Sequence, residues 1–385
     1  MKYIPKYGLV LSGGGARAAY QAGVLKGISE ILGKDFGEHP FPIITGVSAG
    51  AINASQLASG TGSFADQVEK LNGIWNELNP EQVLRTDLRS LSSLGAGWIK
   101  DLSFGGMLGK SESTHLLDSS PLTKLLEGNI DYEQIHKNIL NKTLEGVAVT
   151  ATSYSTGTSL TFFDSLETSE WNRSSRIGIK GPLKLEHVLA SSAIPLMFKP
   201  VRIGKSYFGD GGIRSNTPLS PAIHLGADKI LSIGVRYFRS GGEVRELNQE
   251  VEMKSITLSD IAGVMFNSVF LDAIEFDYER LKRINATLEL ISEEVRANQP
   301  SHLKKIPALL IQPSVDLGLI ATGEFNRFPR MMRYLLKGIG ASKERGADFL
   351  SYIAFDKAYT SKLVDIGLKD AMAKKAEIRR FFEME

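Results

Sequence analysis

The chain has 385 residues, of which 42% are hydrophobic and 23% are charged, and its formal net charge is +2. This composition is typical of a globular protein with a sizeable core, and so small a net charge provides no global field that would attract nucleic acid. Cysteine is absent, which excludes disulfides, a thiol nucleophile and thiolate metal ligands. No apolar run approaches the roughly 20 residues of a membrane span, and residues 1–6 lack an export-signal core, so we expect a cytoplasmic protein, soluble or peripheral on a membrane.

Strand and helix signals alternate along the first part of the chain. The expected strands are residues 7–11, 41–47, 146–153, 159–163 and 229–235, and helices are expected at 16–32 and from 51 onward. This alternation predicts a mostly parallel central sheet that is covered by helices on both faces. Ligands of such sheets bind at the carboxyl ends of the strands, so the turns that follow the first two strands are candidate site segments.

The turn after the first strand is rich in glycine and has two interpretations. Gly13, Gly15 and Ala18 match the dinucleotide fingerprint G-x-G-x-x-G/A, but that site requires an acidic residue at the end of the second strand, where this chain has a serine turn. The alternative is an oxyanion hole, in which the consecutive amides of Gly13, Gly14 and Gly15 stabilise a developing negative charge. We therefore favour the oxyanion hole.

The turn after the second strand places Ser48 in a G-x-S-x-G motif. In a nucleophile elbow of this kind the serine lies on strained backbone between a strand and a helix. Gly46 and Gly50 allow the strand and helix to approach closely, and the helix N-terminus favours an anion beside Ser48. The alternative is a Gly/Ser-rich turn without any chemistry.

Residues 84–113 interrupt the alternation and combine serine and glycine with scattered apolar side chains. One interpretation is a mobile apolar cap over a lipid-sized site, and the other is irregular structure that packs on the core.

A nucleophilic serine requires a base, and Asp210 is the best-placed candidate. It precedes Gly211 and Gly212 in a glycine turn, and two aromatic residues come just before this turn in the sequence. A partly desolvated carboxylate at such a position would keep its basicity. A D-G-G surface turn is the alternative, and a Ser-Asp-His triad also stays open. None of the histidines has a compelling local context; they are His39, His115, His136, His187, His224 and His302.

After Phe238 the pattern changes. The sequence predicts an amphipathic helix at 259–284, a strand at 307–312 and a mainly helical segment from 325 to the end. We therefore divide the chain into a catalytic domain, 7–238, and a mainly helical C-terminal region, 239–385, packed on it. Residues 325–345 carry six basic side chains and one acidic side chain among apolar ones, so this stretch either rests on an anionic membrane or packs on the catalytic domain with a solvated cationic edge.

Four motifs occur in an order that resembles the signature of the patatin-like phospholipase family. They are G-G-G-A-R at 13–17, G-V-S-A-G at 46–50, A-S-S-A-I-P at 190–195 and D-G-G at 210–212, and the resemblance covers residues 7 to 235. It implies a three-layer α/β fold and a Ser-Asp dyad with Ser48 as nucleophile and Asp210 as base, and it implies no cofactor or metal. Arg17 matches the arginine of the family, although whether it contacts substrate or braces the loop stays open. Ala18 stands where many members have glycine.

The residues and the resemblance together predict a lipid acyl hydrolase of the phospholipase A or lysophospholipase type, which cleaves fatty-acyl esters through an acyl-enzyme. The expected substrate is a lipid, and phospholipid is the first candidate, although the sequence does not distinguish it from a lysophospholipid or a neutral ester. A non-catalytic lipid- or membrane-binding protein on the same scaffold is the alternative. The sequence does not indicate the head group, the sn position, the oligomeric state or any protein partner.

Overall fold

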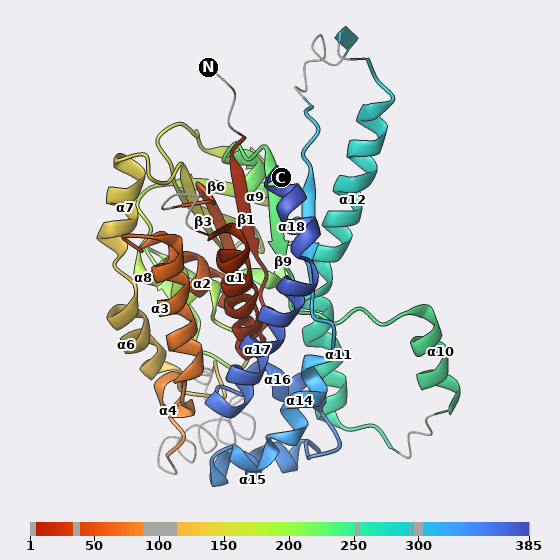
Figure 1. The fold of residues 1–385 in the computed structure, drawn as a ribbon. Coiled ribbons are helices and arrows are strands. Elements are labelled where there is room, and N and C mark those ends of the chain that lie inside the picture. Colours follow the sequence, from red (N-terminus) through yellow and green to blue (C-terminus); the bar gives the residue numbers. More distant parts are fainter. Residues whose placement is uncertain are drawn as a thin grey trace.

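A mixed ten-stranded sheet forms the middle layer of the computed structural model (Figure 1). The described residues are 5–33, 39–87, 114–250, 255–292, 294–295 and 303–384. The strands in that part of the chain are β1 (Tyr7–Leu11), β2 (Ile43–Val47), β3 (Gly146–Ser153), β4 (Ser159–Asp164), β5 (Trp171–Arg173), β6 (Arg176–Lys180), β7 (Val201–Ile203), β8 (Ser206–Asp210), β9 (Lys229–Ile233) and β10 (Ala308–Ile311).

The strand pairing brings the ends of β2 and β8 together along one edge of β3, because β4 occupies the other edge. The order is β10-β9-β1-β2-β3-β4-β6-β5, and the five strands from β10 to β3 are parallel to one another. β8 pairs with the last residues of β3 in the antiparallel direction, with Asp210 opposite Ala151. Val47 lies opposite Thr150 of the same strand. Consequently, Ser48, which follows Val47, and Asp210, the last residue of β8, reach the same level of the sheet.

Helices cover both faces of this sheet. They are α1 (Ala19–Leu32), α2 (Ala49–Ala58), α3 (Phe64–Asn76), α4 (Pro80–Val83), α6 (Ser120–Asn129), α7 (Tyr132–Leu140), α8 (Leu185–Ser191), α9 (Ser220–His224), α10 (Gly241–Glu250), α11 (Leu258–Phe270), α12 (Asp272–Glu289), α14 (Leu317–Gly323), α15 (Arg330–Gly338), α16 (Ala347–Ile353), α17 (Lys357–Ala373) and α18 (Lys375–Phe381). The described residues also form the short 3₁₀ helices η1 (Gly15–Ala18), η3 (Gly211–Ile213) and η4 (Phe325–Arg327). None of the helices that the structure describes is long and apolar enough to cross a bilayer.

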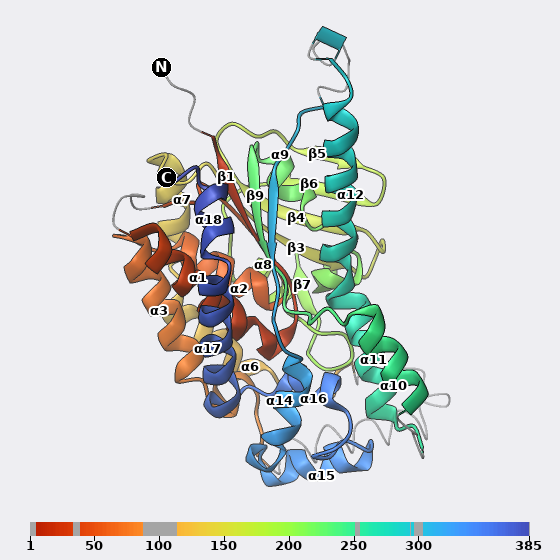
Figure 2. The ribbon, with the colours of Figure 1, turned by 45° about the vertical axis from the view of Figure 1, so that its right-hand side comes forward.

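Alternate residues of the central strands enter two separate cores. Leu9 and Leu11 of β1 belong to the core beneath α1, α2 and α17, whereas Val10 belongs to the core beneath α9 and α12. Figure 2 shows α12 on one side of the sheet and α1, α17 and α18 on the other. Because successive side chains of a strand point to opposite faces, a strand buried on both faces is apolar throughout. The predicted three-layer α/β class is confirmed.

Residues beyond 238 contribute to the same layers. β10 extends the sheet by pairing in parallel with β9, and α17 packs against α1. The helix predicted at 259–284 is two helices, α11 and α12, because the chain turns at Leu271, which is buried against the glycine-rich loop near Gly14. A domain boundary at 238 stays a prediction. Most of the predicted cap at 84–113 lies outside the described residues, which resume at 114.

Candidate active site

Ser48 lies on a strained turn between β2 and α2. Its φ is 54° and its ψ is −131°, a combination that non-glycine residues rarely adopt. A Cβ at Gly46 would lie 2.3 Å from the carbonyl oxygen of Gly50, and a Cβ at Gly50 would lie 2.3 Å from the carbonyl oxygen of Leu11. Both flanking positions therefore require glycine, because the backbones of β2, α2 and β1 meet here.

Asp210 lies directly opposite Ser48. The Ser48 hydroxyl donates a hydrogen bond to Asp210 Oδ2 at 2.5 Å, and the two residues are almost completely buried. Asp210 Oδ1 accepts from the amide of Gly212 at 2.8 Å, while Thr152 Oγ1 donates to the main-chain oxygen of Asp210. These bonds fix the orientation of the carboxylate.

Burial in this position changes the acidity of Asp210. Desolvation raises the pKa of the Asp210 carboxyl to about 7, even though the hydrogen bonds from Ser48 and Gly212 act in the opposite direction. A carboxylate with such a pKa is a far better proton acceptor near neutral pH than an ordinary aspartate, because its pKa is close to the working pH.

The turn after Asp210 is also closely packed. A Cβ at Gly211 would lie 2.0 Å from the carbonyl oxygen of Thr150, and a Cβ at Gly212 would lie 2.4 Å from the ring of Phe270. These two glycines therefore allow the carboxylate to sit tightly between β3 and α11.

The glycine-rich loop lies on the other side of Ser48. A Cβ at Gly13 would lie 2.9 Å from the Cβ of Ser48. Gly14 and Gly15 have φ values of 146° and 58°, conformations that favour glycine. The backbone of the loop can therefore approach Ser48 more closely than a chain with side chains would allow.

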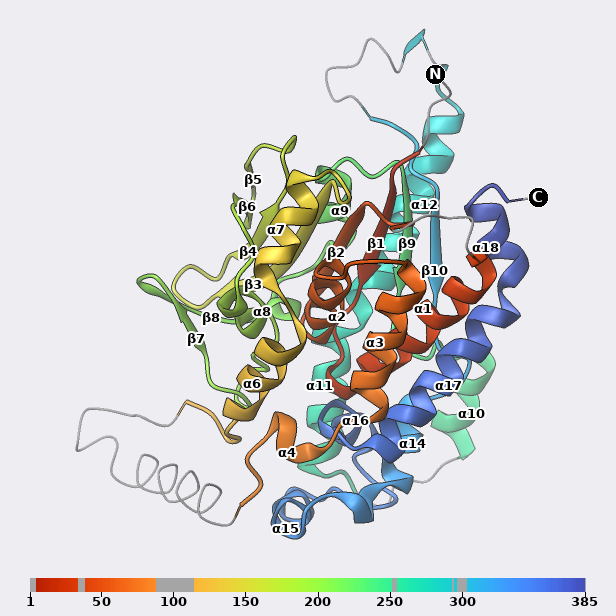
Figure 3. The ribbon, with the colours of Figure 1, turned by 60° about the vertical axis from the view of Figure 1, so that its left-hand side comes forward.

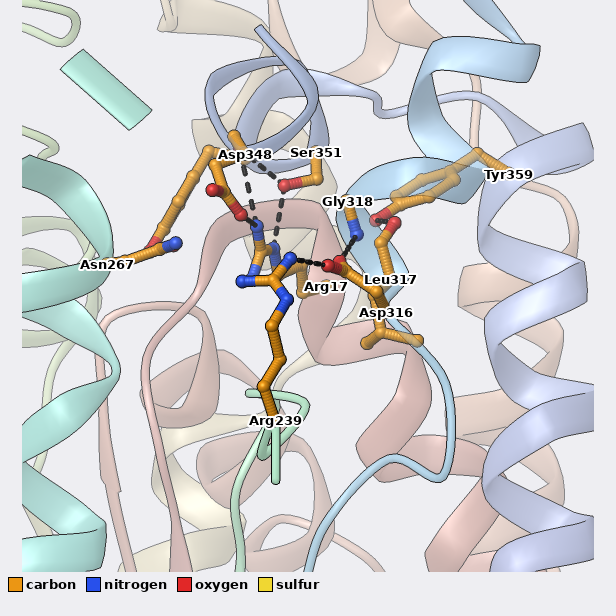
Figure 4. A network of polar contacts seen from close by, with 10 residues as sticks. Arg17, Arg239, Asn267, Asp316, Leu317, Gly318, Asp348, Ser351 and Tyr359 are labelled. Atoms are coloured by element: carbon orange, nitrogen blue, oxygen red, sulfur yellow. Dashed lines mark hydrogen bonds and ion pairs between the residues drawn. The ribbon is translucent and has the colours of Figure 1, made fainter. Parts of the chain in front are cut away.

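Arg17 is directed away from the serine and into the C-terminal region. Its side chain is only 3% exposed, and Nη2 lies 2.7 Å from Asp348 Oδ1. Nε donates to Ser351 Oγ at 2.6 Å, and the guanidinium lies 5.0 Å from the ring centre of Tyr352. Figure 4 shows the Arg17 guanidinium next to Asp348 and Ser351 of α16.

Ser48 is one of the residues that line an apolar pocket. Its walls come mainly from α2, α3 and α6, which lie close together in Figure 3. The space amounts to about 680 Å³, including the part open to solvent. The apolar lining residues are Ala49, Ile52, Leu71, Ile74, Trp75, Leu78, Val83, Leu122, Leu125, Leu126, Ile130, Ile194, Phe198 and Phe355.

The model of one protein family, described as patatin-like phospholipase, matches residues 9–223, which is more than half of the chain. The chain belongs to the patatin-like phospholipase family. The "cGAMP-activated phospholipase" of Pseudomonas aeruginosa is 28% identical over 219 residues, covering 57% of this chain and 56% of that protein. This family member thus matches little more than half of its curated relative's length.

Solved structures with similar folds include human GIVD cytosolic phospholipase A2 and VipD from Legionella pneumophila. The first is 11% identical with a TM-score of 0.43 and covers 99% of this chain and 59% of that chain. The second is 16% identical with a TM-score of 0.34 and covers 94% of this chain and 67% of that chain.

Within the described residues, the histidines considered as bases make contacts of other kinds. The rings of His187 and His224 stack on aromatic side chains, and His136 Nδ1 lies 2.7 Å from a carboxylate of β4. Burial lowers the pKa of His187 to about 4, which keeps this ring neutral. The remaining three are His39, which lies beside Gln67, His115, which lines a separate cavity, and His302, which lies outside the described residues.

Sequence reasoning did not assign a role to Ser191, although it lies in the A-S-x-A-x-P motif of the family. Its hydroxyl accepts a hydrogen bond from the amide of Ser48 at 3.0 Å and donates to the carbonyl oxygen of Thr150 at 2.6 Å. Two residues later, the carbonyl oxygen of Ala193 accepts from the amide of Asp210. The motif therefore joins the elbow to the Asp210 turn.

Proposed function

We propose that this protein is a lipid acyl hydrolase that cleaves a fatty-acyl ester bond of a phospholipid. One observation carries the proposal: the hydroxyl of Ser48, which lines an apolar pocket, donates to a buried carboxylate. Membership of the patatin-like phospholipase family supports it, and the Pseudomonas aeruginosa relative is itself named a phospholipase. The choice of phospholipid as the proposed substrate rests on these two similarities.

Acylation begins when Asp210 Oδ2 takes the proton of Ser48 and Ser48 Oγ attacks the carbonyl carbon of the ester. The tetrahedral intermediate collapses as the carbon–oxygen bond to the alcohol breaks, and the proton on Asp210 passes to that alcohol. This leaves an acyl-enzyme on Ser48. Asp210 then takes a proton from water, the hydroxide attacks the acyl carbon, and the proton returns to Ser48 Oγ as the fatty acid leaves.

The amides of Gly13, Gly14 and Gly15 stabilise the oxyanion in both steps. This assignment is supported by the close approach of Gly13 to Ser48, where a Cβ at Gly13 would lie 2.9 Å from the Ser48 Cβ, and by the 3₁₀ helix η1 that begins at Gly15. Backbone amides at such a position are worth about 3 kcal/mol each in the transition state, since they are oriented before the charge develops. No residue of this mechanism requires a metal or cofactor.

The apolar pocket is the proposed site of the acyl chain. Burying methylene groups among its aliphatic and aromatic side chains contributes about 0.8 kcal/mol for each group, so a long chain gains more than a short one. The ester carbonyl would then lie at Ser48, and the polar head group would remain outside the pocket.

The proposed function is tested with a fluorophosphonate probe and a defined phospholipid. The wild-type protein should be labelled at Ser48 and should release fatty acid, because the phosphonate takes the place of the acyl group on the serine. Ser48→Ala should abolish labelling, and both Ser48→Ala and Asp210→Asn should lower fatty-acid release by at least about a thousandfold. Mass spectrometry of the labelled peptide identifies the modified residue.

Ser191→Ala is a useful companion variant, because it changes a hydroxyl next to the elbow without removing the nucleophile. It should reduce the labelling rate but keep the label on Ser48. Labelling that persists in Ser48→Ala would place the nucleophile elsewhere. Vesicle binding without any fatty-acid release by the wild type would favour the non-catalytic alternative.

A further inference from the structure

The glycine-rich loop is held by residues that follow it by more than 200 positions. A Cβ at Gly14 would lie 2.5 Å from Val235 Cγ2 and 3.4 Å from Leu271 Cδ2, and a Cβ at Gly15 would lie 2.2 Å from the carbonyl oxygen of Tyr352. Three consecutive glycines have large conformational freedom, so they require external contacts to keep a defined shape. Those contacts come from Val235, two residues after β9, from Leu271, directly before α12, and from Tyr352 near the end of α16.

Arg17 is the strongest of these links. Its guanidinium is buried, and taking a charge out of water costs several kcal/mol unless partners compensate for it. Compensation comes from the carboxylate of Asp348, the hydroxyl of Ser351 and the ring of Tyr352, which are all residues of α16. Without Asp348, Arg17 would have to move toward water, and η1 and the loop would move with it.

Asp348 is itself held in place. Burial raises the pKa of Asp348, but Arg17 and Asn267 outweigh this effect, so the pKa is lower than usual and the carboxylate is charged at neutral pH. A Cβ at Gly263 would lie 2.8 Å from the Cβ of Asp348, and the hydroxyl of Tyr352 donates to Asn267 Oδ1 at 3.2 Å. Figure 4 shows Asn267 of α11 directed toward Asp348. Contacts from α11 therefore help to fix the position of α16.

We propose that Asp348, assisted by Ser351, is a positioning residue for the reaction and that it fixes the oxyanion loop through Arg17. Neither residue reaches Ser48 or the substrate pocket. The C-terminal region thus completes the catalytic machinery that the family motifs begin. The proposal rests on the function proposed above, because it assigns the loop to oxyanion stabilisation.

The test uses the full-length protein and the variant Asp348→Asn, with a soluble short-chain ester as substrate. We expect kcat to fall by about ten- to a hundredfold while KM changes by less than about threefold, because displaced oxyanion donors weaken the transition state and not ground-state binding. The rate of fluorophosphonate labelling at Ser48 should fall by a similar factor. The activities are compared under conditions in which circular dichroism shows that the variant is folded.

Glu324→Gln is the matched control. Glu324 is another carboxylate of the C-terminal region with two cationic partners, Arg327 and Lys362, and it does not contact the loop. This variant should keep the wild-type kcat and labelling rate. Ser351→Ala removes one bond to Arg17 without leaving an unpaired charge, so it should fold and lower kcat by about three- to tenfold.

A double-mutant cycle gives a readout that a purely structural role would not affect. If Asp348 acts through Arg17, then Arg17→Gln combined with Asp348→Asn should lower kcat no further than Asp348→Asn alone. The inference would be overturned if the losses in kcat from the two substitutions multiplied in the double variant. A folded Asp348→Asn protein with the wild-type kcat would also overturn it. A wild-type protein that the probe does not label would instead overturn the proposed function on which it rests.

Discussion

The protonation state of a single residue, Asp210, determines when the proposed dyad is able to work. The carboxylate must be ionised to accept the Ser48 proton, but its complete burial penalises the charge. The result is a pKa of about 7, so that a substantial fraction of the protein is protonated at Asp210 at slightly acidic pH. The same burial that makes Asp210 a good base therefore sets a lower pH limit on its action.

We expect kcat/KM for a soluble ester to fall about tenfold per pH unit below pH 7 and to level off above it, because only the ionised form of Asp210 accepts the proton. The measurement is a pH–rate profile from pH 4.5 to 9, with circular dichroism at each pH as the control for folding. A profile that is flat between pH 5 and 8 would contradict Asp210 as the base.

At the scale of secondary structure elements, glycines set how closely helices and strands pack. A Cβ at Gly23 of α1 would lie 1.9 Å from the carbonyl oxygen of Val364, and one at Gly367 of α17 would lie 2.2 Å from the carbonyl oxygen of Tyr20. The two helix backbones are therefore in direct contact. α17 follows α16, so this contact also holds the helix that supports Arg17.

Gly23→Ala should destabilise the protein by at least about 2 kcal/mol, because the new methyl group collides with backbone that has no space to move. Gly73→Ala is the matched control on α3, where no atom lies within 4 Å of the new methyl group, and it should stabilise the helix by about 0.5–1 kcal/mol. Urea unfolding of both variants checks this pair. Equal effects at the two positions would be inconsistent with close packing of α1 on α17.

The sequence predicted the elements better than it predicted their partners. β1 and β3 have the predicted bounds, since each is a short apolar run between clear turn signals. Ser48 and Asp210 were identified because each lies in a contiguous motif, although their catalytic roles stay predictions. The partners of Arg17 lie 331 and 334 residues further along the chain, and nothing in the local sequence around Asp348 marks it as part of the site. Contacts of this kind depend on the folded arrangement.

For the molecule as a whole, the position of α15 bears on contact with a membrane. Of the apolar side chains in 325–345, Phe325, Phe328, Met332 and Leu336 are buried, so this part of the stretch packs on the protein. Tyr334 and Leu335 are exposed, as are four apolar residues of α11, whose Ser259 amide donates to the carbonyl oxygen of Ile339. The four are Leu258, Ile261, Val264 and Met265. The start of α11 is therefore joined to the basic stretch at the end of α15, and Figure 2 shows both helices in the lower part of the molecule.

We propose that this end contacts anionic lipid, and charge reversal tests it. Arg330→Glu combined with Lys337→Glu should weaken binding to vesicles that contain phosphatidylglycerol by at least about tenfold, because each basic residue near such a surface contributes about 1 kcal/mol. The effect should decrease as salt increases, since the attraction is screened. Turnover of a soluble ester should be unchanged. Co-sedimentation with vesicles measures the binding.

Lys282→Glu combined with Arg283→Glu is the control, because it changes the net charge equally. Both residues are exposed on α12, which extends to the opposite end of the molecule from α15 (Figure 1). If vesicle binding depends on the basic residues of α15 and not on the net charge, this control variant should bind vesicles like the wild type. An equal loss in the two variants would indicate a response to net charge alone, and the face formed by α11 and α15 would then have no special part in binding.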